Sequence, residues 1–383
     1  MKAVGSLDIV TGILGSFWPV WLAIAIVMSL SWTYHRRLGL YGRIYESPLG
    51  VAGLFIVLFW FFTAVFADVV APFAPLDQFV MLKNKLPGSI EPGSGLVQYF
   101  GGDKFGRDVF SRMVYGSQIV LVIAPAATAF AVMVGITLGL PAGYYGGRID
   151  AFLSFLANLV LAFPVILLFY LLVTPGIRET ALPKVMAGLF FLFPIVFFTL
   201  LFVSRFRERP DRLWVQLFLV FAIGGWVYAS LVFDADPFGV LSLDPNELNI
   251  FVAVVFASSP GVFRIVRGLT MDIATRDYVA ASQTRGEGPW YVMLWEILPN
   301  ARGPLIVDAC LRIGYTTILL GTLGYFGLGL VPESPDWGTT IKEGSRLLRA
   351  YVHPALPPAF ALMSFVLGLN LLADALREQS LKD

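Results

Sequence analysis

Long apolar stretches separated by polar segments make up most of this chain. A helix needs about 20 mostly apolar residues to cross the hydrocarbon core of a membrane. The stretches that meet this requirement are 14–33, 49–70, 117–140, 151–173, 185–204, 213–233, 248–266, 304–330 and 355–374. Ser258-Ser259-Pro260-Gly261 is expected to break the seventh stretch, which is tolerable only where neighbours satisfy the freed backbone. The pattern predicts an all-α protein that crosses the membrane several times.

One polar segment, 271–304, stands out from this pattern because it is too long for a simple connection. Tyr278–Ser282 is predicted to form a short helix, and the glycines and proline at 286–289 are predicted to form a turn. Trp290–Ile297 is predicted to form a second short helix that Pro299 stops. Two short amphipathic helices in such a segment indicate a docking surface for another protein.

The composition supports a membrane protein. Hydrophobic residues make up 57% of the chain and charged residues only 14%, whereas a soluble domain carries roughly 25% charged residues. The net charge of +1 is uninformative because the distribution of charge matters here. The single cysteine, Cys310, excludes an internal disulfide and a cysteine metal site.

The distribution of arginines predicts the orientation in the membrane. Short loops on the cytoplasmic side carry an excess of Lys and Arg, and the arginine-rich segments all fall on one side if the chain crosses nine times: 34–48, 205–212 and 264–303. Loop 233–247 has no Lys or Arg and falls on the opposite side. We therefore expect the N-terminus outside and the C-terminus in the cytoplasm. Loops 71–116 and 331–354 carry basic residues outside and are exceptions.

Two of the predicted outer segments are expected to be ordered. Segment 98–119 is glycine-punctuated, with Asp108 and Arg112 at helical spacing, and is predicted to lead into an interfacial amphipathic helix before the third span. Segment 331–349 is a second candidate, with Trp337 as an interfacial anchor. Together they form either a lid or receptor-docking surface, or simple caps on helix ends.

Residue patterns for catalysis are nearly absent. The two histidines, His35 and His353, have no partner at metal-ligand spacing and are expected at a surface or interface. No G-x-x-x-x-G-K-[ST] phosphate loop occurs. Helix packing explains Gly324, Gly327 and Gly329 better than phosphate binding does.

Ionisable residues within the predicted spans are few. Asp308 and Arg312 in the eighth span are four residues apart, so they share a helix face and can pair. We expect a neutralised pair near the inner interface rather than a substrate site. A proton- or sodium-coupled carrier usually needs more intramembrane carboxylates, which disfavours a secondary transporter.

Four stretches resemble the inner-membrane permeases of ABC importers, specifically the C-type subunit of the dipeptide/oligopeptide/nickel class. The first, FGGDKFGRDVFSRMVYGS at 100–117, is similar to the subclass pattern F-G-T-D-x-x-G-R-D-V-x-S-R-x-x-Y-G. The second is LGLPAGYYGGRID at 138–150 with the LAFP that follows, and the third is the coupling loop at 277–300. The fourth is LGYFGLGLVPESPDWG at 323–338, supported by the C-terminal GLNLLADALRE.

Three positions depart from the family pattern. In the coupling loop, E-A-A-x3-G-x9-I-x-L-P, the leading Glu is Ala280 and the apolar position before Leu-Pro is Glu296. One contact to an ATPase is therefore expected to be weaker or differently made. The Thr of the outer motif is Gly102.

The resemblance implies a type I ABC importer permease-like six-helix core, to which this chain adds about three transmembrane helices. The implied divisions are an N-terminal helix and loop at 1–48, core parts at 49–175 and 246–377, an inserted transmembrane hairpin at 176–245, and a cytoplasmic tail at 378–383. Without the three extra spans, the six-span core keeps its coupling loop in the cytoplasm, in agreement with the arginine distribution.

The resemblance also implies the function and partners. The chain would form half of a translocation pathway in the bacterial inner membrane, beside a sister permease subunit, two ATP-binding cassette ATPases and an extracytoplasmic substrate-binding protein. It would lack an ATPase site, a cofactor, a metal and a nucleic-acid partner. Its substrate would be di- or oligopeptides, with nickel chelates and oligosaccharides left open as alternatives. Coupling to the ATPase is assigned to Tyr278, Val279, Ala280, Ala281, Ser282, Gly286, Trp290, Leu298 and Pro299. Receptor docking is assigned to Asp103, Gly106, Arg107, Asp108, Arg112, Trp337 and Gly338.

Two other functions remain as alternatives. A secondary carrier would act alone, and an integral-membrane transferase would act on lipid-linked substrates. The sequence lacks the paired exposed carboxylates or the metal site near an interface that a transferase would need. Co-purification of ATPase subunits is expected only for the importer.

Overall fold

The computed structural model describes residues 4–178, 180–239, 245–328 and 333–380, which are almost all helical. A small ribbon pairs β1 (Ser89–Ile90) with β2 (Val97–Gln98) in antiparallel register. The chain divides into two compact units. Unit 1 comprises Met1–Pro125 and Cys310–Asp383, and unit 2 comprises Ala126–Ala309.

The predicted membrane-spanning stretches are mostly helical where the structure describes them. Among the described residues, seven helices are long and apolar enough to cross a membrane, and two bent helix pairs raise the number to nine if each pair is one span. This confirms the prediction of an all-α polytopic membrane protein. Residues 329–332, in the eighth stretch and the loop after it, 240–244 in the loop after the sixth, and 381–383 in the tail lie outside the described residues.

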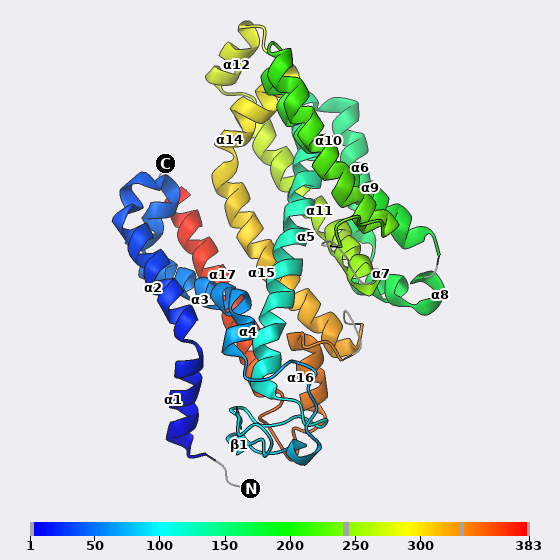
Figure 1. The fold of residues 1–383 in the computed structure, drawn as a ribbon. Coiled ribbons are helices and arrows are strands. Elements are labelled where there is room, and N and C mark those ends of the chain that lie inside the picture. Colours follow the sequence, from blue (N-terminus) through cyan, green and yellow to red (C-terminus); the bar gives the residue numbers. More distant parts are fainter. Residues whose placement is uncertain (1–3, 179, 240–244, 329–332, 381–383) are drawn as a thin grey trace. The chain divides into compact units, whose positions relative to one another are not determined.

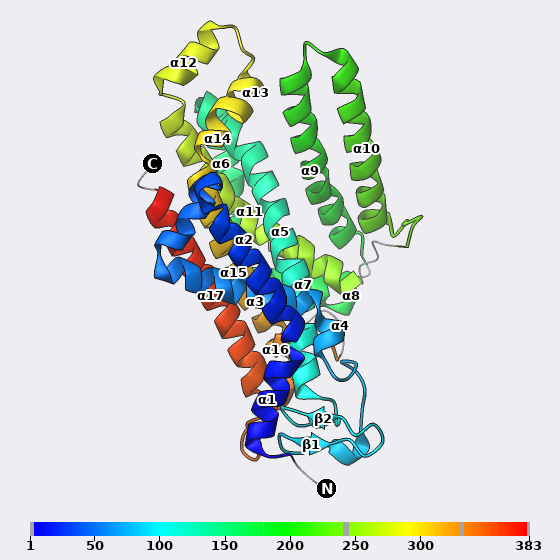
Figure 2. The same ribbon diagram turned by 60° about the vertical axis from the view of Figure 1, so that its left-hand side comes forward.

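Unit 1 consists of the two ends of the chain. Its complete elements are α1 (Ser6–Ser16), α2 (Trp18–Thr33), the 3-10 helices η1 (His35–Arg37), η2 (Gly39–Glu46) and η3 (Val80–Leu82), α3 (Pro48–Val65), α4 (Ala67–Val70), the ribbon, α16 (Trp337–Ser345) and α17 (Leu356–Ser380). Helices α5 (Val109–Tyr145) and α15 (Arg302–Phe326) contribute residues to both units. Helices α2, α3 and α17 lie side by side (Figures 1 and 2).

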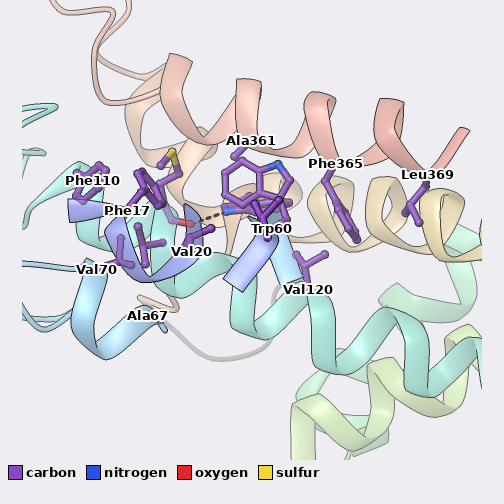
Figure 3. Close-up of a cluster of buried hydrophobic side chains, with 14 residues drawn as sticks. Phe17, Val20, Trp60, Ala67, Val70, Phe110, Val120, Ala361, Phe365 and Leu369 are labelled. Carbon is purple, nitrogen blue, oxygen red and sulfur yellow. Dashed lines mark hydrogen bonds between the residues drawn. The ribbon is translucent and has the colours of Figure 1, made fainter. Parts of the chain in front are cut away.

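Aromatic side chains form the core of unit 1 (Figure 3). The ring of Trp60 on α3 meets the ring of Trp337 edge-on at 5.0 Å between centroids. The indole Nε1 of Trp337 donates to the carbonyl of Met113 at 2.8 Å, the dashed line in Figure 3. Gly53 brings α3 against α17, since a Cβ at this position would lie 2.7 Å from the Leu372 nitrogen. Small residues let membrane helices approach this closely.

Two predicted spans are bent rather than straight. The first divides into α1 and α2 at Phe17 with a bend of 51°, because Pro19 has no N–H to continue the helical ladder. The fourth divides into α6 (Gly147–Ala162) and α7 (Val165–Val173) with a bend of 75°. Phe163 is extended there, as expected for the residue before Pro164.

Unit 2 contains the middle of the chain. Besides α6 and α7, it contains α8 (Pro175–Arg178), α9 (Leu182–Phe206), α10 (Pro210–Phe233), α11 (Pro245–Ile273), α12 (Asp277–Thr284), α13 (Pro289–Tyr291), the π-helix η4 (Val292–Ile297) and α14 (Leu298–Asn300). Helices α9 and α10 pack together as a hairpin (Figure 2).

The expected break in the seventh span is wrong, because α11 continues through Pro260. Packing holds the helix together at this point. A glycine stripe on α5, with Gly135 and Gly139 four residues apart, lies against Val262 and Val266 of α11. A Cβ at Gly139 would lie 2.8 Å from that of Val266. The close contact supports α11 where proline removes one backbone hydrogen bond.

The separate interfacial helix predicted within segment 98–119 is also wrong. Helix α5 starts at Val109 and continues without interruption through the third span. Asp108 starts the helix, because its carboxylate accepts the Ser111 N–H at 2.7 Å. Arg112 on the first turn is fully buried. The polar residues of this segment therefore face protein instead of a membrane surface.

Candidate functional site

The first candidate site is the polar segment 271–304 in unit 2, which begins with the predicted short helix. Helix α12 (Asp277–Thr284) includes the whole of the predicted Tyr278–Ser282. It ends at Thr284, and the chain reverses at Gly286, whose φ of +83° lies in the left-handed region and whose N–H bonds to the Gln283 carbonyl. Glycine reaches this conformation without a steric cost, which makes it the usual residue after a helix end.

Helix α12 has one buried face and one exposed face. Val279 and Ser282 are fully buried, and Val279 belongs to the core of unit 2. Val279 therefore offers no surface to a partner. This corrects the expectation from the sequence that Val279 contacts the ATPase. Tyr278 is 40% exposed, and Ala280 and Ala281 are exposed as well. The exposed face of α12 also carries the polar side chains of Asp277, Gln283 and Thr284.

The second half of the segment differs from the predicted single helix. It runs through α13, the π-helix η4 and α14, and Pro299 does not stop it. Pro299 sits in the first turn of α14, where a missing N–H costs little. The chain turns at Ala301 before α15 begins. Trp290 and Leu298 are half-buried, and Pro299 is exposed.

Side-chain contacts fix α12 to the rest of unit 2. The guanidinium of Arg285 pairs with Glu296 of η4 at 3.1 Å. Gln283 Nε2 donates to the Tyr144 hydroxyl of α5 at 2.9 Å. These two contacts therefore hold α12 against η4 and α5, so that its exposed face keeps a fixed position. Such an arrangement can transmit a displacement from a bound partner into the long helices.

The second candidate site, in unit 1, is a buried cluster of Asp103, Arg107, Arg112 and Glu343, called here the arginine cluster. Arg107 and Arg112 are both fully buried. Arg107 Nε donates to Asp103 at 2.7 Å, and its Nη2 also pairs with Glu343. Arg112 reaches Glu343 at 3.4 Å and the Ser334 carbonyl at 2.8 Å. These contacts join the segment before α5 to the segment around α16.

Two further buried carboxyls flank the arginine cluster. Desolvation raises the pKa of Asp108 to about 7, although hydrogen bonds from Ser111 oppose this. Desolvation also raises the pKa of Asp336, which caps α16 by accepting the Thr339 N–H at 2.8 Å. Both groups therefore combine a structural role at a helix start with a cost for carrying charge.

The remaining predicted docking residues lie beside the cluster and are structural. Trp337 is 1% exposed, so the expectation of an interfacial anchor is wrong: its ring is in the core. Gly338 and Gly106 each lie against another backbone, since a Cβ on either would come within 2.1 Å of the Gly321 or Phe79 carbonyl oxygen. The same packing holds Gly324 beside Gly338, as predicted for the glycines of this stretch, whereas Gly329 lies outside the described residues.

Glu343 is the member of the cluster that sequence reasoning missed. It lies 236 residues from Arg107, and no local pattern connects the two. Its position on α16, six residues after Trp337, places it opposite both arginines. Segment 98–119 itself gave no sign of a distant acid, since its two arginines are matched by two aspartates.

The other residues considered from the sequence have minor roles. Asp308 and Arg312 both lie on α15, four residues apart, and their pairing stays a prediction. His353 is buried rather than interfacial, with Nε2 3.3 Å from the Gly102 carbonyl, and burial lowers its pKa. In the part of the chain that the structure describes, no group of three His, Cys, Asp or Glu residues could hold a metal.

Comparison with known proteins yields consistent similarities. Residues 213–380 match the family of binding-protein-dependent transport system inner membrane components, and residues 41–87 match the N-terminal TM domain of oligopeptide transport permease C. The chain is 26% identical over 333 residues to the dipeptide transport system permease protein of Alkalihalophilus pseudofirmus, covering 87% of this chain and 85% of that protein.

Two other relatives show the same extent of similarity. The di/tripeptide transport system permease protein of Pseudomonas aeruginosa is 28% identical over 348 residues, covering 88% of this chain and 92% of the relative. The glutathione transport system permease protein of Pectobacterium atrosepticum is 27% identical over 327 residues, covering 85% and 84%.

Proposed function

We propose that this chain is an inner-membrane component of a binding-protein-dependent transport system and forms half of an importer's pathway for di- or oligopeptides, which its similarity to such components supports. The relatives named above transport dipeptides, tripeptides or glutathione according to their names. A sister permease subunit supplies the other half, and a binding protein delivers the peptide. The N-terminus lies outside and the C-terminus in the cytoplasm, a proposal that the arginine distribution supports.

The exposed face of α12 is where a separate ATPase docks. This assignment rests on one observation: α12 presents Tyr278, Ala280 and Ala281 to solvent while its buried face is fixed to η4. Docking onto a surface that could move independently would transmit no displacement. The Arg285–Glu296 ion pair is part of this fixation, so Glu296 strengthens the base of α12 at a position where the family has an apolar residue.

The arginine cluster holds the outer surface in shape for the binding protein. Its arginines are too deeply buried to contact a receptor directly. The receptor instead meets the segment that the cluster organises, including the exposed side chains of Val80 and Met81 of η3. The predicted docking residues thus position the surface and do not form it.

Two substitutions test the docking assignment. Ala281→Asp places a charge on the exposed face of α12, and Gly286→Pro cannot adopt the positive φ at the helix end. Both variants are expected to insert into the membrane and to lose peptide uptake and co-purification with the ATPase. Normal uptake in Ala281→Asp would show that α12 is not part of the docking surface.

Energy coupling separates the importer from a secondary carrier. Uptake by proteoliposomes that contain the full assembly should stop with vanadate and persist when the proton gradient is collapsed. Uptake that fails only when the gradient is collapsed would instead indicate a carrier acting alone. A lipid-linked transferase would show neither behaviour.

A further inference from the structure

A cavity of about 980 Å³ lies in unit 2 between the end of the α9–α10 hairpin and the start of α13. Its walls are unusually rich in arginine for the end of a membrane hairpin. The hairpin contributes four arginines and one glutamate, and the polar segment contributes one further glutamate: Arg205, Arg207, Arg209, Arg212, Glu208 and Glu287. Positive charge therefore predominates in the cavity wall.

Three of the four arginines are available to a ligand. Across residues 180–239 and 245–328, which hold the whole cavity, the side chains of Arg207, Arg209 and Arg212 make no ion pair. All three are exposed. A planar guanidinium can form two parallel hydrogen bonds to a phosphate, and such charge-assisted bonds are roughly twice as strong as neutral ones. Helix α10 also begins at Pro210 beside them, and a helix N-terminus attracts anions.

The surroundings of the cavity point to a lipid as the source of the phosphate. Directly beyond the arginines, α9 and α10 turn large apolar side chains outward, including Trp214 at 71% exposure and Phe218 at 72%. Trp290 and Tyr291 line the cavity itself. Tryptophan and tyrosine are enriched at the level of lipid headgroups. A free phosphate would use the arginines alone, whereas a phospholipid uses the arginines and the apolar faces together.

We propose that this cavity binds the phosphate headgroup of an anionic phospholipid, with Arg207, Arg209 and Arg212 as its ligands. The acyl chains lie along the exposed apolar faces of α9 and α10. Basic pockets between membrane helices are a known way to recognise such headgroups. The site is independent of transport and stands whether or not α12 docks an ATPase.

The fourth arginine connects the site to the polar segment. Arg205 Nη1 donates to the Tyr291 hydroxyl at 3.2 Å, and its guanidinium lies over the Trp295 ring at 4.9 Å. Trp295 Nε1 in turn donates to Ser204 Oγ at 3.1 Å. A lipid that orders residues 205–212 therefore also steadies the π-helix on which α12 rests.

Lipid binding to the full chain tests the proposal. The purified protein is titrated in detergent with dioleoylphosphatidylglycerol or dioleoylphosphatidylcholine, and retained lipid is counted by native mass spectrometry. We expect tighter retention of phosphatidylglycerol. The variant Arg207→Gln, Arg209→Gln, Arg212→Gln should weaken it by at least about tenfold, because three charge-assisted contacts are lost.

Two further variants control for charge and folding. Arg36→Gln, Arg37→Gln, Arg148→Gln removes the same charge from exposed positions elsewhere and should keep the preference. Replacing Arg207, Arg209 and Arg212 with Lys keeps the charge but loses the paired guanidinium hydrogen bonds, so it should restore binding only in part. Equal retention of the two lipids, or an equal loss in the distant triple variant, would overturn the proposal. So would arginine-dependent binding of inorganic phosphate with no gain from phosphatidylglycerol.

Discussion

Arg285 at the end of α12 and Glu296 on the π-helix η4 form an ion pair with 3.1 Å between Nη2 and Oε1. The pair joins the two halves of the polar segment across the reversal at Gly286. Because Arg285 is well exposed, the pair contributes little to global stability, about 0–1 kcal/mol. Its importance lies in keeping α12 and η4 in one arrangement.

Glu296→Gln should therefore uncouple transport without unfolding the protein. We expect an almost unchanged apparent Tm and a higher number of ATP molecules hydrolysed per peptide imported. Both are measured in the reconstituted assembly. Arg285→Gln should have the same effect, and the double variant should be no worse than either single variant. Additive losses would show that the two residues act separately.

Gly286→Ala should destabilise the end of α12 through its backbone alone. A Cβ at Gly286 meets nothing within 4 Å, but the φ of +83° costs a non-glycine residue about 1 kcal/mol. Gly288→Ala is the matched control, since it also meets open space but has a φ of −69°. Hydrogen exchange of residues 277–286 should quicken in Gly286→Ala only. Equal exchange in both variants would contradict a role for the left-handed conformation.

Gly139→Ala should disturb the contact between α5 and α11. Its Cβ would lie 2.8 Å from that of Val266 and 3.0 Å from the Phe263 carbonyl oxygen, and overpacking of this kind costs about 1–3 kcal/mol. Gly268→Ala on α11 meets nothing within 4 Å and should be neutral or slightly stabilising. Thermal unfolding in detergent compares the two. A neutral Gly139→Ala would show that the helices can separate at no cost.

Glu343→Gln should destabilise unit 1 strongly. It leaves Arg107 and Arg112 buried with one carboxylate fewer, and breaking a buried ion pair costs about 3–5 kcal/mol. Glu333→Gln is the matched control because the Glu333 side chain is exposed, while its backbone carbonyl still accepts from Arg112. Limited proteolysis of the 71–108 region should quicken in the first variant alone. Similar proteolysis of the two variants would show that Glu343 does not stabilise the arginine cluster.

Asp108 should make stability depend on pH. Burial raises its pKa in the folded protein to about 7 from the ordinary value of 3.8. Between these pH values the folded state holds a proton that the unfolded state has lost, so the contribution of this group to stability falls as pH rises from about 4 to about 7. Asp108→Asn cannot titrate and keeps an acceptor for Ser111.

The comparison between the two proteins isolates this group. From pH 5 to pH 8, the apparent Tm of the wild-type protein should fall further than that of Asp108→Asn. Asp336 changes stability in the same direction in both proteins and cancels. An equal fall in the two proteins would show that Asp108 is charged throughout the range.

The reversal at 286–289 and the helix before it could be read from the sequence because both depend on neighbouring residues. Gly286 is two residues from Thr284, and helix end signals act over such distances. The continuation past Pro299 could not be read in this way. Proline stops a helix interior but fits its first turn, and only the surrounding packing decides which of these Pro299 occupies.

The burial of the side chains in the arginine cluster could not be predicted from the sequence either. The spacing of Asp108 and Arg112 is compatible with an amphipathic helix on a membrane surface and with a buried helix start. Glu343, distant in sequence, decides between them, because it supplies the carboxylate that makes burial of Arg107 and Arg112 tolerable. Val279 and Trp337 lie in the core and not at a surface, because apolar side chains distant in sequence pack around them.

By itself the sequence determined that this protein is a set of apolar helices with one long polar segment at 271–304. Membrane spans depend only on the apolar content of about 20 consecutive residues, which is a local property. The tertiary structure decided where the first and fourth spans bend, that α11 passes through Pro260, and that Arg285 pairs with Glu296. These features depend on contacts between elements, and no local pattern contains them.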